Sequence, residues 1–166
     1  MKVFLGGTCA GTIWREALIP MLKCDYFDPV VDDWTEECMA EEIRQREECD
    51  YCLYVITPSM QGVYSIAEVV DDSNKRPKKT ILCILNRDVL PGEIGGRIKT
   101  KNISFGKTFS EHELKSLAQV VKMVEKNGAV YFDNLEAVAD FLNGAQFAKA
   151  RNDLINRIKT IRGKEK

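Results

Sequence analysis

The sequence predicts an α/β fold in which helices cover both faces of a parallel sheet. Three observations lead to this prediction. Apolar segments of strand length alternate along the chain with segments of helical pattern, which is the order of a doubly wound sheet. Two apolar segments, 51–57 and 79–85, are almost uninterrupted, as expected of strands buried on both faces. The 166 residues, 45% hydrophobic and 30% charged, are typical of one globular domain.

Strands and helices alternate from the first residues onward. The elements predicted before residue 58 are a strand at 2–5, a helix at 13–23, a strand or extended segment at 26–31, a helix at 36–50 and a strand at 51–57. Pro20 is expected to shorten the first helix, because proline lacks the N–H that a helix interior needs. Thr35 is a good N-cap for the second helix, although Cys38 stands where a capping box has Glu.

The same alternation continues, with one interruption. The later predicted elements are a helix at 62–75, a strand at 79–85, a helix at 110–128, a strand at 129–132 and a helix at 135–143 that ends before Gly144. The third of these is a capped helix that begins at Ser110 and ends at Asn127-Gly128, and Asp133 or Asn134 caps the last. Residues 86–108 have a loop-like sequence, long for a compact domain, and indicate a lid, a mobile loop or an irregular strand.

The end of the chain differs in charge from the rest. Residues 145–166 hold seven Lys or Arg and two acidic residues, a net charge of +5, and the remainder carries −6. A helix here would place apolar residues on one side, namely Leu154, Ile155, Ile158 and Ile161. We expect residues 1–143 to form the domain and 144–166 a basic helix or tail. Three alternatives stay open: a helix packed on the domain or on a subunit partner, a basic arm for an anionic partner, or a disordered tail.

Composition and charge exclude several classes of protein. The net charge of −1 and the pI of about 5.9 give no cationic field for nucleic acid. No run of about 18 apolar residues is present that would span a membrane. The start, MKVFLGG, is too short and too soon rich in glycine for a signal peptide. The six cysteines are scattered through predicted strands and helices, which favours reduced thiols and a cytoplasmic location.

A metal site is not expected. Cys49-x-x-Cys52 has the spacing of a redox or metal pair, but no second pair accompanies it and the chain contains one histidine, His112. We therefore expect neither a metal ion nor an organic cofactor.

Three loops are expected at the edge of the sheet where parallel strands end, which is where ligands bind in this class of fold. They are 6–12, 31–34 and 57–62. The first, GGTCAGT, resembles a phosphate-binding loop only loosely, since it matches neither G-x-G-x-x-G nor the Walker A pattern. Its glycines allow backbone to approach a ligand closely, or they form a tight turn between strand and helix.

Glu68 is an acidic residue among apolar neighbours. It stands about two turns into the predicted helix at 62–75, on the face of Tyr64 and close to Ser65. If this face looks toward the strand ends, a partly buried carboxylate acts as a base or a nucleophile. The alternative is a solvated glutamate on the helix surface.

The stretch CDYCLYVITPSMQGVYSIAEVV resembles nucleoside 2-deoxyribosyltransferases and their relatives. The start KVFLGGTCAGTIWRE resembles the first strand and glycine loop of that family, and PVVDDW and YFDNLEAVADFLN are typical of its "like" branch. The resemblance covers about residues 1–143. It implies a flavodoxin-like three-layer α/β/α sandwich with a central parallel sheet of about five strands.

The resemblance also implies roles for particular residues. Glu68 matches the nucleophile that attacks the anomeric carbon. Glu42 matches an acidic residue that hydrogen-bonds the base or protonates it, and the alternative is a surface i,i+4 partner of Arg46. The residues expected to bind substrate are Gly6, Gly7, Thr8, Asp32, Asp33, Trp34, Gly62, Tyr64 and Ser65.

Two positions depart from the family pattern. Phe4 stands where the enzymes carry a tyrosine that orients the nucleophile, and Gly62 stands where they carry an aspartate. Tyr64, Ser65 or Gln61 would have to compensate. Arg15 is a candidate phosphate contact if the substrate is a nucleotide, with a surface salt bridge as the alternative.

The expected activity is cleavage or exchange of the N-glycosidic bond of 2'-deoxynucleosides by a homo-oligomeric enzyme. The alternatives are a deoxynucleoside monophosphate N-hydrolase, an NAD hydrolase like TIR domains, and an inactive nucleotide-binding module.

Overall fold

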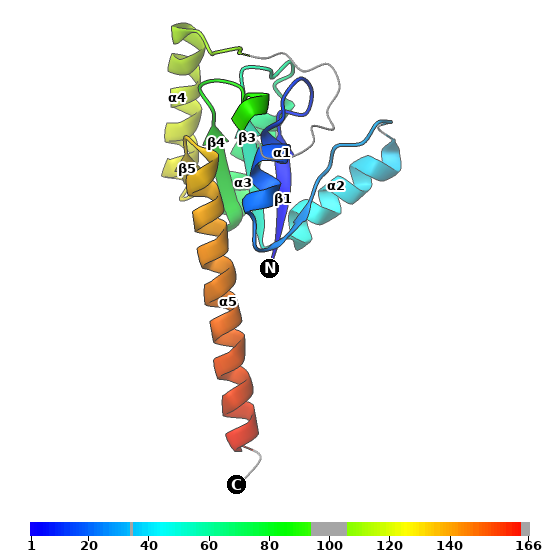
Figure 1. The fold of residues 1–166 in the computed structure, drawn as a ribbon, viewed down its shortest axis with the longest axis vertical. Coiled ribbons are helices and arrows are strands. Elements are labelled where there is room, and N and C mark those ends of the chain that lie inside the picture. The colour runs from blue at the N-terminus through cyan, green and yellow to red at the C-terminus, as the bar shows by residue number, and fades with distance from the viewer. Residues whose placement is uncertain (34, 94–105, 164–166) are drawn as a thin grey trace.

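Five parallel strands form one sheet in the order β2-β1-β3-β4-β5 (Figure 1). The computed structural model describes residues 1–33, 35–93 and 106–163, with side chains as far as residue 157. The strands are β1 (Lys2–Gly7), β2 (Asp25–Phe27), β3 (Tyr51–Ile56), β4 (Thr80–Ile84) and β5 (Val130–Phe132). The α-helices are α1 (Trp14–Leu18), α2 (Glu36–Glu48), α3 (Tyr64–Lys75), α4 (Glu111–Lys126) and α5 (Leu135–Gly163). Short 3-10 turns are η1 (Ile19–Met21), η2 (Pro77–Lys79) and η3 (Pro91–Glu93).

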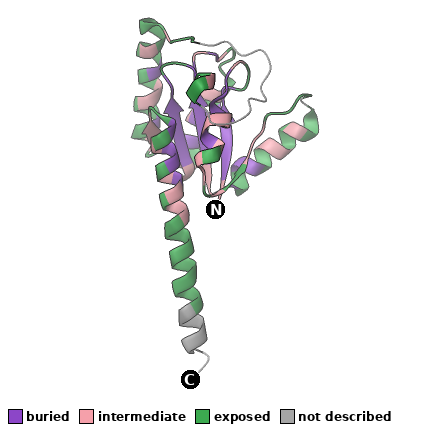
Figure 2. Cartoon of the chain, in the orientation of Figure 1, coloured by how far each residue is buried: buried purple, intermediate pink, exposed green. Residues whose placement is uncertain are grey.

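Helices cover both faces of this sheet, and the strands between them are buried (Figure 2). On one face, Trp14 and Leu18 of α1 and Leu142 of α5 pack against the strands. On the other face, Val69 of α3 and Leu117 of α4 do so. This arrangement confirms the flavodoxin-like α/β sandwich with a central parallel sheet.

The end signals in the sequence act where they were predicted. Pro20 ends α1 after Leu18, and the chain continues as the 3-10 turn η1. The hydroxyl of Thr35 accepts a hydrogen bond from the backbone N–H of Cys38, which caps α2. Ser110 and Glu113 form a complete capping box at the start of α4.

Some predicted boundaries were wrong. β1 includes Gly6 and Gly7, which were predicted to lie in a loop, and α3 begins at Tyr64 instead of Gly62. β2 ends at Phe27, just before Asp28 and Pro29. Proline has no N–H to donate to a neighbouring strand, and it restricts the backbone of the residue before it.

The helix predicted to end before Gly144 continues to Gly163. A single glycine inside a helix costs only about 1 kcal/mol, and good helix formers such as Ala145 and Gln146 follow it. The C-terminal part of α5 projects as a single long helix beyond the rest of the protein (Figure 1).

The segment predicted as an irregular region at 86–108 lies partly outside the described residues. Its described ends meet in an antiparallel bridge between Arg87 and Thr108, with η3 between them in the sequence. Among the helices of the described chain, none has the length and apolar character that crossing a membrane requires.

A side chain at Gly7 would clash with the neighbouring strand β3. Its φ is +112°, and a Cβ built there would lie 2.1 Å from the carbonyl oxygen of Val55 and 2.5 Å from its nitrogen. Both are backbone atoms of the central strand, so neither can move aside cheaply. The glycine is therefore required by strand packing.

We predict that Gly7→Ala lowers the free energy of unfolding by at least about 3 kcal/mol, because it combines a strained φ with a clash against β3. Gly62→Ala is the matched control, since nothing lies within 4 Å of the added methyl group. It should change stability by less than about 1 kcal/mol. Urea unfolding followed by circular dichroism measures both, and equal stabilities of the two variants would contradict the prediction.

Candidate active site

Glu68 lies inside the protein in an ion pair. It is the fifth residue of α3, one turn after the helix begins, and only 6% of it is exposed. Its Oε1 accepts a hydrogen bond of 2.9 Å from Nη1 of Arg46, in the last turn of α2. The predicted distance of two turns from the helix start was wrong, because α3 begins at Tyr64. The surface alternative for Glu68 was also wrong.

Arg46 joins Glu68 to a second buried carboxylate, that of Asp72. Nη2 of Arg46 lies 2.8 Å from Asp72 Oδ1, and Nε lies 3.3 Å from Oδ2. The Tyr54 hydroxyl donates to Asp72 Oδ2 at 2.5 Å, and Arg76 Nε lies 3.1 Å from Oδ1. These contacts hold the guanidinium of Arg46 in one orientation beneath Glu68.

The spacing of the chain explains this network. Glu68 and Asp72 are four residues apart, so they share the face of α3 that is turned to the sheet. Tyr54 lies on β3 beside Gly6 of β1, and a Cβ at Gly6 would come within 3.0 Å of the Tyr54 ring and 2.7 Å of the Phe4 ring. Gly6 therefore leaves room for two aromatic rings in the layer below the network.

Burial dominates the electrostatics of Glu68. Removal from water raises the pKa of this carboxyl to about 7. The positive charge of Arg46 opposes this rise, and the negative charges of Glu42 and Asp72 add to it. The structure thus brings the two predicted catalytic residues, Glu68 and Glu42, within electrostatic reach of each other. A carboxyl with such a pKa changes between its neutral and ionised forms near neutral pH.

The loops after β1 and β3 are tied together next to this site. The Thr8 hydroxyl accepts a hydrogen bond from the Thr57 N–H at 3.0 Å, and the Thr8 N–H donates to the Val55 carbonyl at 2.8 Å. The Thr8 carbonyl in turn accepts from Trp14 Nε1 at 2.8 Å. Thr8 therefore holds the two loops in register.

Arg15 clamps the end of β1 from the other side. Its Nη2 donates to the Leu5 carbonyl at 2.7 Å, its Nη1 to the Thr8 carbonyl at 2.9 Å, and its Nε lies 3.1 Å from Asp28. The side chain is buried, so neither the surface salt bridge nor a phosphate contact describes its place in this structure.

The other residues expected to bind substrate lie at varying depths. Tyr64 is 65% exposed, Gly62 is exposed, and Ser65 is half-buried. Asp32 and Asp33 are exposed in the segment before α2, beyond its N-terminus. Trp34 lies outside the described residues. Gly6 and Gly7 belong to β1, where close packing against neighbouring groups explains why neither position carries a side chain.

A second group of polar side chains meets at the ends of β1, β3 and β4. The Ser59 hydroxyl lies 2.8 Å from Asp88 Oδ2 and 3.0 Å from the Gly11 carbonyl. In the described part of the chain, Asp88 Oδ1 and Thr12 Oγ1 are buried without a hydrogen-bond partner. These atoms give the edge of the sheet further unused hydrogen-bonding capacity.

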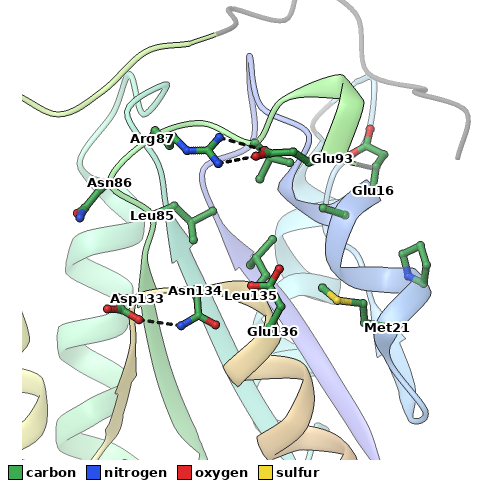
Figure 3. Close-up of a pocket in the computed structure, with 13 residues that line it drawn as sticks. Glu16, Met21, Leu85, Asn86, Arg87, Glu93, Asp133, Asn134, Leu135 and Glu136 are labelled. Carbon is green, nitrogen blue, oxygen red and sulfur yellow. Dashed lines mark hydrogen bonds and ion pairs between the residues drawn. The ribbon is translucent and has the colours of Figure 1, made fainter. Parts of the chain in front are cut away.

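A cavity of about 520 Å³ opens on the other face of the sheet (Figure 3). Its lining comes from α1, η1, the segment after β4 and the start of α5, and includes Glu16, Arg87, Glu93, Asn134 and Glu136. None of the predicted site residues that the structure describes lines it. The described residues also contain no group of three His, Cys, Asp or Glu side chains suited to a metal ion.

Arg46, Asp72 and Tyr54 were not predicted as site residues. Two signals in the sequence pointed to them: a second acidic residue four positions after Glu68, and a tyrosine inside an otherwise apolar strand. Arg46 was considered only as a neighbour of Glu42 on the helix surface. Its contacts with α3 depend on how two helices pack, which no local pattern reveals.

Comparison with known proteins identifies the family of this chain. No match was found among curated proteins or among solved structures. The family described as "Nucleoside 2-deoxyribosyltransferase like" matches residues 1–86, which is more than half of the chain and includes Glu42, Arg46, Glu68 and Asp72. The chain therefore belongs to the nucleoside 2-deoxyribosyltransferase-like family.

Proposed function

We propose that this protein cleaves or exchanges the N-glycosidic bond of 2'-deoxynucleosides, with Glu68 as the nucleophile. The observation that carries the proposal is a carboxylate buried one turn into α3, held in position by an arginine and with a pKa raised to about 7. The charge of Arg46 favours the ionised form and lowers the pKa of Glu68, whereas burial raises it. Here burial outweighs the pairing.

The two oxygens of Glu68 have different surroundings. In the described part of the protein, Oε1 accepts the hydrogen bond from Arg46, and no bond to Oε2 accompanies it. We assign the attack to Oε2, because its lone pairs are not occupied by the guanidinium. Arg46 then orients the carboxylate and keeps enough of it ionised to react.

The reaction has two steps. Oε2 of Glu68 bonds to the anomeric carbon as the carbon–nitrogen bond breaks, and the electron pair of that bond leaves with the base. The leaving nitrogen takes up a proton, which we assign to Glu42. Water or a second base then attacks the anomeric carbon, gives its proton to Glu42 and releases Glu68. The carboxylate also stabilises the positive charge that develops on the sugar.

The hydroxyl missing at Phe4 has a counterpart in Tyr54. Its phenol donates to Asp72, which bonds Arg46, which bonds Glu68. Tyr54 thus acts through two other groups and is a positioning residue. This arrangement supports an active protein over the inactive module. The buried contacts of Arg15 give no support to a phosphate on the substrate.

The surroundings of the thiols support the proposed cytoplasmic location. All six cysteines are free, and Cys49, Cys52 and Cys83 are buried. Such thiols persist in reducing compartments.

We predict that Glu68→Gln and Glu68→Ala both lower the rate of base release by at least about a hundredfold, because neither side chain can form the ester. Asp71→Asn is the control. It alters an exposed carboxylate on the same helix, paired with Lys75, and should leave the rate unchanged. Base release is followed by chromatography with deoxyadenosine plus cytosine, with deoxynucleoside monophosphates, and with NAD, each in a separate reaction.

The outcomes of that experiment separate the candidate functions. Exchange of bases that needs Glu68 supports the transferase, and release without exchange supports a hydrolase. If only the monophosphates or only NAD were turned over, that compound would be the substrate instead of the deoxynucleoside. Binding without turnover in any reaction would leave the inactive module and refute the proposal.

The pH profile gives a second prediction. Only ionised Glu68 attacks, so kcat/KM should rise with pH, by up to about tenfold per pH unit, below a pKa of about 7. At higher pH it should fall again once Glu42 loses the proton that it gives to the base. A profile that is flat between pH 5 and 8 would mean that this carboxylate does not limit the reaction.

The pKa of Glu68 also predicts how stability depends on pH. Its pKa is about 7 in the fold against an ordinary value of 4.5, so the folded chain binds more protons at this group between these values. As pH rises from 4.5 to 7, this group therefore lowers the free energy of unfolding. The total decrease is about 3 kcal/mol, since one pKa unit corresponds to about 1.36 kcal/mol. Glu68→Gln removes this loss.

Relative to the unaltered protein, Glu68→Gln should accordingly gain free energy of unfolding from pH 4.5 to pH 8, as measured by urea titration. Asp71→Asn should show almost no change over this range, because the hydrogen bond from Lys75 lowers the pKa of Asp71 below its ordinary value of 3.8 and the group is ionised throughout. A Glu68→Gln difference that stays constant with pH would show that Glu68 has an ordinary pKa.

A further inference from the structure

Two helices extend away from the body of the protein (Figure 1). The second half of α5 is one of them. Its last described contact with the body is the ion pair of 2.6 Å between Lys149 and Asp50, and all residues from 150 to 157 are exposed. The side chains of residues 150–157 are therefore accessible to a partner.

The first half of α2 is the other. Of the residues of this helix, all of which the structure describes, Gln45 and Arg46 are the buried ones, and both lie near its end. The preceding turns reach into solvent and expose apolar side chains: Met39 is 40% exposed and Ile43 is 51% exposed. Val30 and Val31, in the segment before α2, are exposed to a similar degree.

The two surfaces have opposite charge. Residues 28–48 hold nine acidic and two basic residues, a net charge of −7, whereas residues 145–166 carry +5. On α2, Glu36, Met39, Ile43 and Glu47 follow one another at three or four residues and so share one face. On α5, Phe147, Arg151, Leu154 and Arg157 do the same. Each face thus combines apolar and charged residues, and the charges are negative on α2 and positive on α5.

We propose that α5 of one copy of this chain docks on α2 of a second copy, with its apolar residues on Met39 and Ile43 and its arginines beside Glu36 and Glu47. The exchange is reciprocal in a two-fold dimer, so the same contact forms twice. Pairing of α5 with the partner's α5 is disfavoured, because both helices carry the same positive charge. This proposal does not depend on the chemistry assigned to Glu68.

Two charge-reversal variants test the contact. The first is Arg151→Glu with Arg157→Glu on α5, and the second is Glu36→Lys with Glu47→Lys on α2. All four side chains are exposed, so both variants should fold, which circular dichroism verifies. The unaltered chain should sediment at twice its mass of 18.8 kDa, and each variant alone at 18.8 kDa, because each then opposes like charges.

An equimolar mixture of the two variants gives the decisive measurement. In the mixed pair, the acidic α5 of the first variant faces the basic α2 of the second, and the unaltered α5 faces the unaltered α2. Both contacts are therefore restored, and the mixture should return to twice the chain mass. Lys122→Glu, an exposed reversal on α4, should not change the mass.

Other results would overturn the proposal. An unaltered chain that is a monomer throughout a concentration series has no such dimer, and binding of its α5 to nucleic acid instead would identify an anionic partner. A dimer that resists the α2 reversal but not the α5 reversal would indicate pairing of α5 with itself. A mixture that stays monomeric would show that the two helices do not meet.

Discussion

The guanidinium of Arg46 links α2 to α3 and, through Asp72, to β3. It bonds Glu68 and Asp72 of α3, and Asp72 bonds the hydroxyl of Tyr54 on β3. A buried carboxylate left without a cation costs several kcal/mol, so the ion pair with Arg46 stabilises the charge of Glu68 inside the fold, whereas Asp72 also pairs with Arg76. The end of α2 is held against the body by this contact and by two hydrogen bonds, from Lys2 to Gln45 and from Arg76 to the Arg46 carbonyl. The position of Glu68 and the attachment of α2 therefore share one buried ion pair.

The architecture could be predicted because local signals agreed with one another. Uninterrupted apolar strands, Pro20, Thr35 and the capping box of Ser110 each act over a few residues and appear in the structure as expected. Errors in the element boundaries arose where the neighbouring residues favoured a different structure from the one that a single residue indicated. Gly144 was taken to end a helix, but one glycine is a small penalty among good helix formers.

Within the site, sequence reasoning found the acid but not what holds it. Glu68 could be recognised because a charge among apolar residues is costly unless it has a use. Arg46, Asp72 and Tyr54 could not be assigned to it, because their contacts form between elements far apart in the chain. For Gly6 and Gly7, local sequence suggested a ligand-binding loop after a strand. In the structure both glycines lie within β1, where Gly6 leaves room for two aromatic rings and Gly7 for the backbone of β3.

The two ends of α2 have different surroundings, and this difference connects the site to the outer surface. Arg46 holds one end against α3, whereas Met39 and Ile43 at the other end are exposed. Glu42 lies between them, and its charge acts on Glu68. Glu42 stands one turn before Arg46, so the carboxylate proposed to transfer the proton is carried by the same helix as the exposed apolar surface. A partner that covers Met39 and Ile43 would therefore lie on the helix that carries Glu42.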